Sequence, residues 1–76
     1  SDYTAFNLLG MEVQVSDDQL SKALKCLPEK KRNIILLSYF MDMSDAEIGE
    51  LINVLRTTVY RHRTSILEEL RKMMEE

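Results

Sequence analysis

The stretch SDAEIGELINVLRTTVYRHRTS, residues 44–65, decides the fold because it contains the start and end of one helix and the start of another. Ser44 and Glu47 have the spacing of a capping box, in which each side chain hydrogen-bonds a backbone N–H near the start of a helix. We therefore expect a helix over Asp45–Ile52. Asn53 follows it, and Asn is the commonest residue after Gly in the left-handed conformation that ends a helix. A short turn and a second helix should come next.

Two helices joined by a short turn pack at a steep angle only where their contact is small and apolar. Apolar residues stand where the two helices should face each other: Ile48, Ile52, Val54 and Val59. Gly49 removes the side chain at the expected point of closest approach, although a glycine inside a helix costs about 0.5 to 1 kcal/mol relative to alanine. The pattern predicts a helix-turn-helix in which close packing outweighs helix propensity.

The second helix of this pair is expected to begin near Arg56 and to be the longest element. Its apolar side chains follow a helical period over about five turns: Val59, Ile66, Leu67, Leu70, Met73 and Met74. At about 100° per residue, the opposite side carries Thr57, Tyr60, Arg61 and Thr64. Residues 53–65 contain three arginines and no acid. Such a face can present hydrogen-bond donors to bases and phosphates in the major groove of DNA.

Two further helices are expected upstream. Ser16, followed by two aspartates, is the expected N-cap of the first helix. The apolar residues of this helix have helical spacing: Leu20, Ala23, Leu24 and Leu27. Pro28 lacks a backbone donor and suits the first position of a helix, so the second is expected over residues 28–41. Its run Ile34–Leu37 is apolar on nearly all sides, which predicts the central element of a bundle.

The segment before these helices alternates apolar and polar residues, as a β-strand does. Its apolar positions are Phe6, Leu8, Met11, Val13 and Val15. They are interrupted at Leu9-Gly10, where glycine tolerates the positive φ of a tight hairpin turn. Residues 1–15 are therefore expected to form a short β-hairpin or extended arm, and residues 16–76 a mainly α, four-helix domain with a C-terminal helix-turn-helix. Because a lone hairpin is marginally stable, it should pack on the helices or pair with a second chain as the contact of a homodimer.

The composition excludes several functional classes. The chain has 76 residues, a net charge of −3, one cysteine and one histidine. Cys26 and His62 offer no disulfide and no zinc-ligand set, so Cys26 is expected in the core. No apolar run approaches the roughly 18 to 20 residues that span a bilayer, which predicts a soluble, cytoplasmic protein without membrane contact. Without a cleft or an activated nucleophile, we expect no cofactor and no enzymatic activity.

Two runs of the sequence resemble region 4 of the bacterial sigma-70 family. They are ALKCLPEKKRNIILLSYFMDMSDAEIGELI, residues 23–52, and TTVYRHR, residues 57–63. The family pattern is A-L, L-P, a basic residue, an apolar helix, E-I-A and T-V, and the resemblance covers about residues 23–73. It is closest to the short sigma-like regulators of conjugative transposons, which share the alternating N-terminal segment and the Y-R-H-R run. The resemblance implies four helices, of which the last reads the −35 promoter element and the first contact the RNA polymerase flap.

The resemblance also assigns roles to residues. Arg56, Thr57 and Arg61 match base-reading positions, and Thr58 and Tyr60 match positions near the phosphate backbone. Three residues depart from the family pattern: Gly49 replaces Ala, Asn53 replaces Gly, and Leu55 replaces the Ser or Thr N-cap of the recognition helix. Losing that cap costs about 1 kcal/mol, so the helix start is expected to fray until DNA orders it. Nothing resembles region 2, so the chain is not expected to initiate transcription alone.

Two alternatives remain. Arg63 lies near the apolar edge of the last helix, so it either contacts DNA, or covers the core or pairs with Glu47 or Glu50. The leading function is a sequence-specific transcription regulator that binds double-stranded DNA and RNA polymerase. Its expected DNA-binding residues are Arg56, Thr57, Thr58, Tyr60, Arg61, Arg63 and Thr64. The rival, favoured by the net acidity and the missing N-cap, is a helical module that binds polymerase or another regulator without specific DNA contact.

Overall fold

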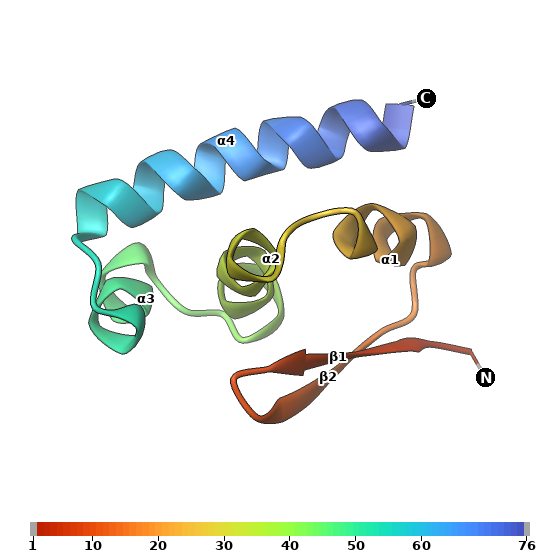
Figure 1. Cartoon of the computed structure of the whole chain (residues 1–76), viewed down its shortest axis with the longest axis horizontal. Helices are drawn as coiled ribbons and strands as arrows, with labels where there is room; N and C mark the ends of the chain where they lie inside the picture. The colour runs from red at the N-terminus through yellow and green to blue at the C-terminus, as the bar shows by residue number, and fades with distance from the viewer. Residues whose placement is uncertain (1, 76) are drawn as a thin grey trace.

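The structure of the protein is a computed structural model that describes residues 2–75. Over these residues a β-hairpin precedes four α-helices, and a π-helical segment continues the second helix. The elements are β1 (Thr4–Leu8), β2 (Met11–Val15), α1 (Asp18–Lys25), α2 (Glu29–Ile35), η1 (Leu36–Phe40), α3 (Asp45–Ile52) and α4 (Arg56–Glu75). Helix α4 lies across α3, α2 and α1, and the hairpin lies on the other side of α2 (Figure 1). The predicted mainly α class, with four helices behind a short hairpin, is confirmed.

The N-terminal segment is a hairpin rather than an extended arm. Strands β1 and β2 pair antiparallel and leave a two-residue loop. Leu9 (φ 51°) and Gly10 (φ 89°) both have the positive φ that such a loop requires. The side-chain oxygen of Asn7 accepts the Gly10 N–H at 2.9 Å. Met11, beside the loop, is exposed, and the buried face of the hairpin consists of Phe6, Leu8, Val13 and Val15.

Helix α1 is capped one residue later than predicted. The side chain of Asp17, not that of Ser16, accepts a backbone N–H of the first turn at 3.0 Å. Ser21, on the inner side of α1, is buried, and its hydroxyl donates to the carbonyl oxygen of Val15 at 3.3 Å. This hydrogen bond ties α1 to the end of β2.

The corner between α1 and α2 exposes Cys26, so the prediction of a core cysteine is wrong. Helix α1 ends at Lys25, and Pro28 precedes the first residue of α2. Within this corner it is Leu27 that faces inward, at 4% exposure. Cys26, the C-cap residue of α1, lies on the outside, and the next residue takes the inward position.

The second helix is the central element, as predicted, because all four residues of the run Ile34–Leu37 are buried. Its last part is wider than an α-helix. The Met41 N–H donates to the Leu36 carbonyl at 3.2 Å, and the Met43 N–H donates to the Leu37 carbonyl at 3.1 Å. In an α-helix each N–H binds the carbonyl four residues earlier, whereas these two bonds reach further back along the chain. Four consecutive side chains cover most of a helix circumference, so they are all buried only because α4 and the hairpin cover opposite sides of α2 (Figure 1).

The turn between α3 and α4 brings two stretches of backbone into contact at Gly49. Asn53 is left-handed (φ 60°, ψ 50°), as predicted, and its N–H donates to the Gly49 carbonyl, as does that of Val54 at 2.8 Å. A Cβ on Gly49 would stand 2.4 Å from the Val54 carbonyl oxygen, so this site requires glycine. The predicted close approach is confirmed. Val54 itself is 37% exposed, so its predicted place between the helices is wrong: its carbonyl, not its side chain, faces α3.

A single core joins the hairpin to the helices. Val59, Ile66 and Leu70 of α4 are buried in one cluster with Ile48 of α3 and the inner face of the hairpin. This packing fixes α4 along most of its length and determines which of its sides remains open. None of the helices within residues 2–75 is long and apolar enough to span a membrane.

Replacing Gly49 by Ala should destabilise the fold by about 1 to 3 kcal/mol, because the added Cβ overlaps the turn backbone and overpacking of this kind has that cost. Chemical denaturation measures the change in the free energy of unfolding. The matched control is Ala46→Gly, an exposed site on the same helix, which should cost about 0.5 to 1 kcal/mol through helix propensity alone. A Gly49→Ala variant that is more stable than the wild type would contradict the close approach.

Candidate nucleic-acid interface

The side of α4 that faces away from the core is exposed over its first turns. Tyr60 is 52% exposed, and the other outward residues, Thr57, Arg61 and Thr64, are exposed as well. Val59, on the opposite side, is completely buried. The orientation predicted for α4 is therefore confirmed, and residues 53–65 place no carboxylate on this face.

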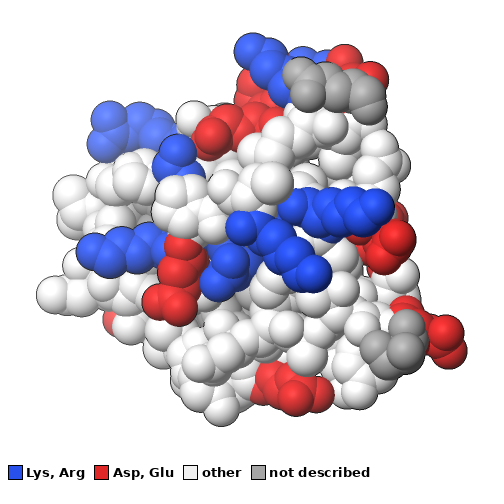
Figure 2. Space-filling model, turned by 45° about the vertical axis from the view of Figure 1, so that its right-hand side comes forward, with Lys and Arg blue, Asp and Glu red and all other residues white. Residues whose placement is uncertain are grey.

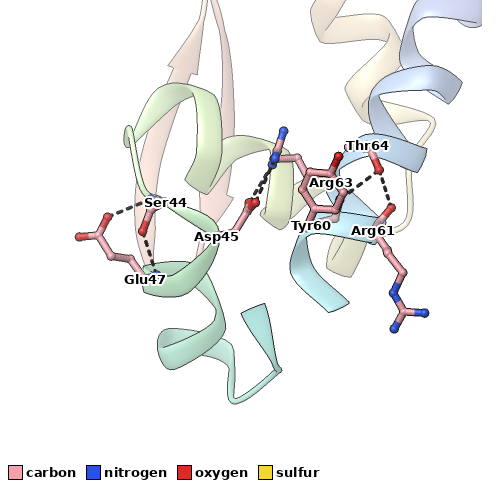
Figure 3. Close-up of polar contacts among 7 residues, drawn as sticks. All are labelled: Ser44, Asp45, Glu47, Tyr60, Arg61, Arg63 and Thr64. Carbon is pink, nitrogen blue, oxygen red and sulfur yellow. Dashed lines mark hydrogen bonds and ion pairs between the residues drawn. The ribbon is translucent and has the colours of Figure 1, made fainter. Parts of the chain in front are cut away.

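Arg61 and Thr64 lie on the outward face with different hydrogen bonding. The guanidinium of Arg61 extends away from α4 (Figure 3), and its only hydrogen bond within residues 2–75 is a long one to the Thr58 hydroxyl, at 3.4 Å. The Thr64 hydroxyl contacts the carbonyl oxygens of Tyr60 and Arg61 at 3.0 and 3.1 Å, so its proton is directed to its own helix. Arg61 is thus the better placed of the two to donate to a ligand.

Arg63 is held within the protein by an ion pair that the sequence did not predict. Its Nε and Nη2 donate to the two carboxylate oxygens of Asp45 at 2.7 and 2.9 Å, and its guanidinium lies 5.4 Å from the centre of the Tyr60 ring (Figure 3). The side chains of Arg63 and Asp45 are only 23% and 18% exposed. The predicted pairing with Glu47 or Glu50 is wrong, because Asp45 at the start of α3 is the acid that faces α4.

Both acids in the first turn of α3 are engaged inside the protein. Hydrogen bonds from Arg63 hold the pKa of the Asp45 carboxyl below its usual value, and the charge of Arg56 lowers this pKa further. Glu47 accepts the Ser44 N–H at 2.9 Å and the Ser44 hydroxyl accepts the Glu47 N–H at 3.1 Å, so the predicted capping box is confirmed. This bonding lowers the pKa of Glu47 as well. Neither carboxylate hydrogen-bonds Arg61.

The start of α4 combines a cation with an uncapped helix end. Arg56, its first residue, is exposed. Leu55, just before it, is 75% exposed and has no side-chain acceptor with which to cap the first N–H groups. The Val59 N–H donates to the Leu55 carbonyl at 3.0 Å. The N–H groups before Val59 have no carbonyl of the same helix to bind, as at the start of any α-helix. Thr58 is partly buried on the flank of α4 that faces α2.

Beside Thr58, a cavity of about 350 Å³ opens between α2, the turn and α4. Its lining is mainly apolar and consists of Lys30, Asn33, Ile34, Ile52, Val54, Thr58, Val59 and His62. The side-chain oxygen of Asn33 is buried without a hydrogen-bond partner. His62 is exposed at this cavity. No group of His, Cys, Asp and Glu side chains within residues 2–75 could hold a metal ion.

A second group of basic side chains forms a band at the level of α1 and α2 (Figure 2). These helices contain Lys22, Lys25, Lys30, Lys31 and Arg32. Lys31 pairs with Glu69 of α4 at 3.1 Å, and the Arg32 guanidinium lies 5.3 Å from the centre of the Phe6 ring. Among the described residues the three other lysines form no ion pair, although acidic side chains lie beside the band (Figure 2).

Comparison with known proteins gives a family and a relative. Residues 17–70, which begin after the hairpin, match the family described as "Sigma-70, region 4". The chain is 33% identical over 67 residues to the ECF RNA polymerase sigma factor SigW of Bacillus subtilis (strain 168). The match covers 83% of this chain but only 35% of that protein, so the chain spans about a third of its relative's length. No solved structure matches.

The Asp45–Arg63 pair predicts a pH-dependent contribution to stability. The pKa of Asp45 is lowered in the folded state, so its stabilisation is complete above its ordinary value of 3.8 and is lost as the pH falls through the folded-state pKa. At neutral pH, Asp45→Asn should cost about 1 kcal/mol, as expected for a partly buried, two-bond pair. Urea denaturation over a pH series should show this difference shrinking below pH 3.8.

Asp2→Asn, which makes the same change at an exposed site in the N-terminal segment, is the control and should have the stability of the wild type at neutral pH. A cost of Asp45→Asn that stays constant down to strongly acidic pH would contradict a stabilising role for the ionised carboxylate.

Proposed function

Because the chain belongs to the sigma-70 region 4 family, we propose that it is a sequence-specific, DNA-binding transcription regulator whose helix α4 enters the major groove of a −35-like promoter site. The observation that supports this most is the open, acid-free first half of α4. DNA carries a dense row of phosphates, so a surface that docks on it needs cations, and carboxylates facing the phosphates are unfavourable. The N-terminal end of a helix adds partial positive charge to such a surface.

The outward residues divide into base readers and backbone contacts. Arg61 and Arg56 are the proposed readers because guanidinium donates two parallel hydrogen bonds to guanine O6 and N7, and Thr57 lies between them on the first turn of α4. Thr58, Tyr60 and Thr64 are proposed to lie near the sugar-phosphate backbone, where hydroxyl groups commonly bind. Of these, the Thr64 hydroxyl donates to a phosphate only if it gives up its hydrogen bonds to its own helix.

Arg63 has two predicted roles, and its ion pair favours the one within the protein. Both oxygens of Asp45 are bound to its guanidinium, and the Tyr60 ring lies beside it. We therefore propose that Arg63 does not contact DNA itself. Its role is to hold α4 against α3 and to position the Tyr60 side chain. A direct contact of Arg63 with a phosphate would require exchange of a two-bond pair for a new one.

RNA polymerase is the proposed protein partner. The relative SigW is named as an RNA polymerase sigma factor. The band of basic side chains on α1 and α2 offers positive charge to an acidic partner. A protein with this role works beside the chromosome, in the cytoplasm. Pairing of two chains through β1 or β2 remains a prediction, which sedimentation at high concentration can test.

The alternative is a helical module that binds polymerase or another regulator without specific DNA contact. A net charge of −3 and several exposed apolar side chains, among them Leu51, Val54 and Leu55 near the turn, favour it. The acid-free face of α4 has no evident purpose in such a module. For this reason DNA binding is the better supported function.

Selection from a random duplex pool, with and without polymerase, tests the proposal. We expect one preferred sequence to be enriched. With about 4 to 6 phosphates neutralised, the logarithm of the binding constant should fall against that of the salt concentration with a slope of about −4 to −5. Failure to enrich any sequence, together with salt-independent binding to polymerase, would favour the protein-only alternative.

Arg61→Ala should weaken binding to the preferred duplex by about 1 to 3 kcal/mol and blur the preference at one base pair, because one two-bond contact to a base is lost. Fluorescence anisotropy on the preferred duplex and on its single-base variants measures both effects. The matched control is Arg71→Ala: Arg71 is on the same helix but pairs with Glu68 and Glu75 near its far end, and its loss should leave affinity unchanged. An equal loss of affinity on all sequences would instead make Arg61 a phosphate anchor.

A further inference from the structure

Leu55 occupies a position where neither packing nor capping explains a leucine. At 75% exposure it is the most open of the exposed large apolar side chains. It immediately precedes α4, at the site where an oxygen-bearing side chain would accept a free helix N–H. A leucine there leaves those N–H groups uncapped and places its isobutyl group in water.

The turn holds Leu55 in a defined place. The N–H groups of Asn53 and Val54 both donate to the Gly49 carbonyl, and the Val54 carbonyl is in contact with the Gly49 backbone. The Leu55 carbonyl then accepts the first helical N–H of α4, from Val59. In Figure 1 this turn lies at the outer edge of the domain, at the opposite end of α4 from α1. The hydrogen bonds of the turn therefore place Leu55 next to the outward residues Arg56 and Thr57.

We propose that Leu55 is a specificity residue that reads thymine through its 5-methyl group. This inference rests on the proposed entry of α4 into the major groove. The thymine methyl is the apolar feature of that groove, and aliphatic side chains discriminate thymine by contact with it. An apolar side chain at the leading end of the inserted helix suits this contact. It stands where the family pattern has Ser or Thr, whose hydroxyl would cap the helix and offer no comparable apolar group.

Deoxyuridine, which lacks only that methyl group, provides the test. In the selected duplex, each thymine is replaced in turn by deoxyuridine, and the affinity of the wild type and of three variants is measured. Leu55→Ser removes the apolar group and adds an N-cap, so it cannot act by unfolding the helix. Leu55→Met keeps an apolar side chain. Leu9→Ser makes the same change at an exposed leucine in the hairpin loop, on the other side of α2 from α4.

The wild type and the Leu9→Ser and Leu55→Met variants should lose about threefold to fivefold in affinity at one thymine, the loss expected for one buried methyl group. Leu55→Ser should bind the thymine and deoxyuridine duplexes equally. A deoxyuridine penalty that persists in Leu55→Ser, or no penalty at any thymine in the wild type, overturns the inference and leaves the proposed function intact. No enrichment of any duplex overturns both.

Discussion

The close approach of the Val54 carbonyl to Gly49 is the constraint on which the rest of the structure depends. Two backbone N–H groups bind the Gly49 carbonyl, and the Val54 carbonyl oxygen lies only 2.4 Å from where a Cβ on Gly49 would stand. Because no side chain separates the two backbones, α4 starts immediately beside the end of α3. Val59 then reaches the core at complete burial, and the helix periodicity sends Arg61 outward. The glycine thus sets where α4 starts, and the burial of Val59, Ile66 and Leu70 then determines which side of α4 is open.

Several carboxylates of this acidic protein are engaged away from the outward side of α4. Asp45 binds Arg63, and Glu47 binds the backbone of Ser44. Near the C-terminal end of α4, Arg71 pairs with two glutamates of its own helix. Arg56 and Arg61, which lie between these groups in the sequence, form no ion pair within residues 2–75. Net charge is a poor guide to partners in such a protein, because docking depends on the potential of one face.

Local signals in the sequence predicted the features that determine the interface. Three features could be predicted directly from the sequence because each depends on residues only a few positions apart. They are the capping box, the left-handed Asn53 and the apolar stripe of α4. The Asp45–Arg63 pair could not, because the partners are 18 residues apart and their contact requires the interhelix angle. The wide η1 segment also escaped prediction, because it depends on burial from several sides. The exposure of Cys26 escaped prediction because it depends on where α1 ends. The likeness to conjugative-transposon regulators remains a prediction.

Amide NMR spectra of the labelled protein, titrated with its selected duplex, test most directly the claim that the open half of α4 is the docking surface. The largest shift changes should lie within residues 55–64, where helix α4 and the end of the turn meet the groove. The hairpin and the last turns of α4 should change little, because they face other directions. Changes concentrated on β1, β2 or the C-terminal half of α4 would contradict the account.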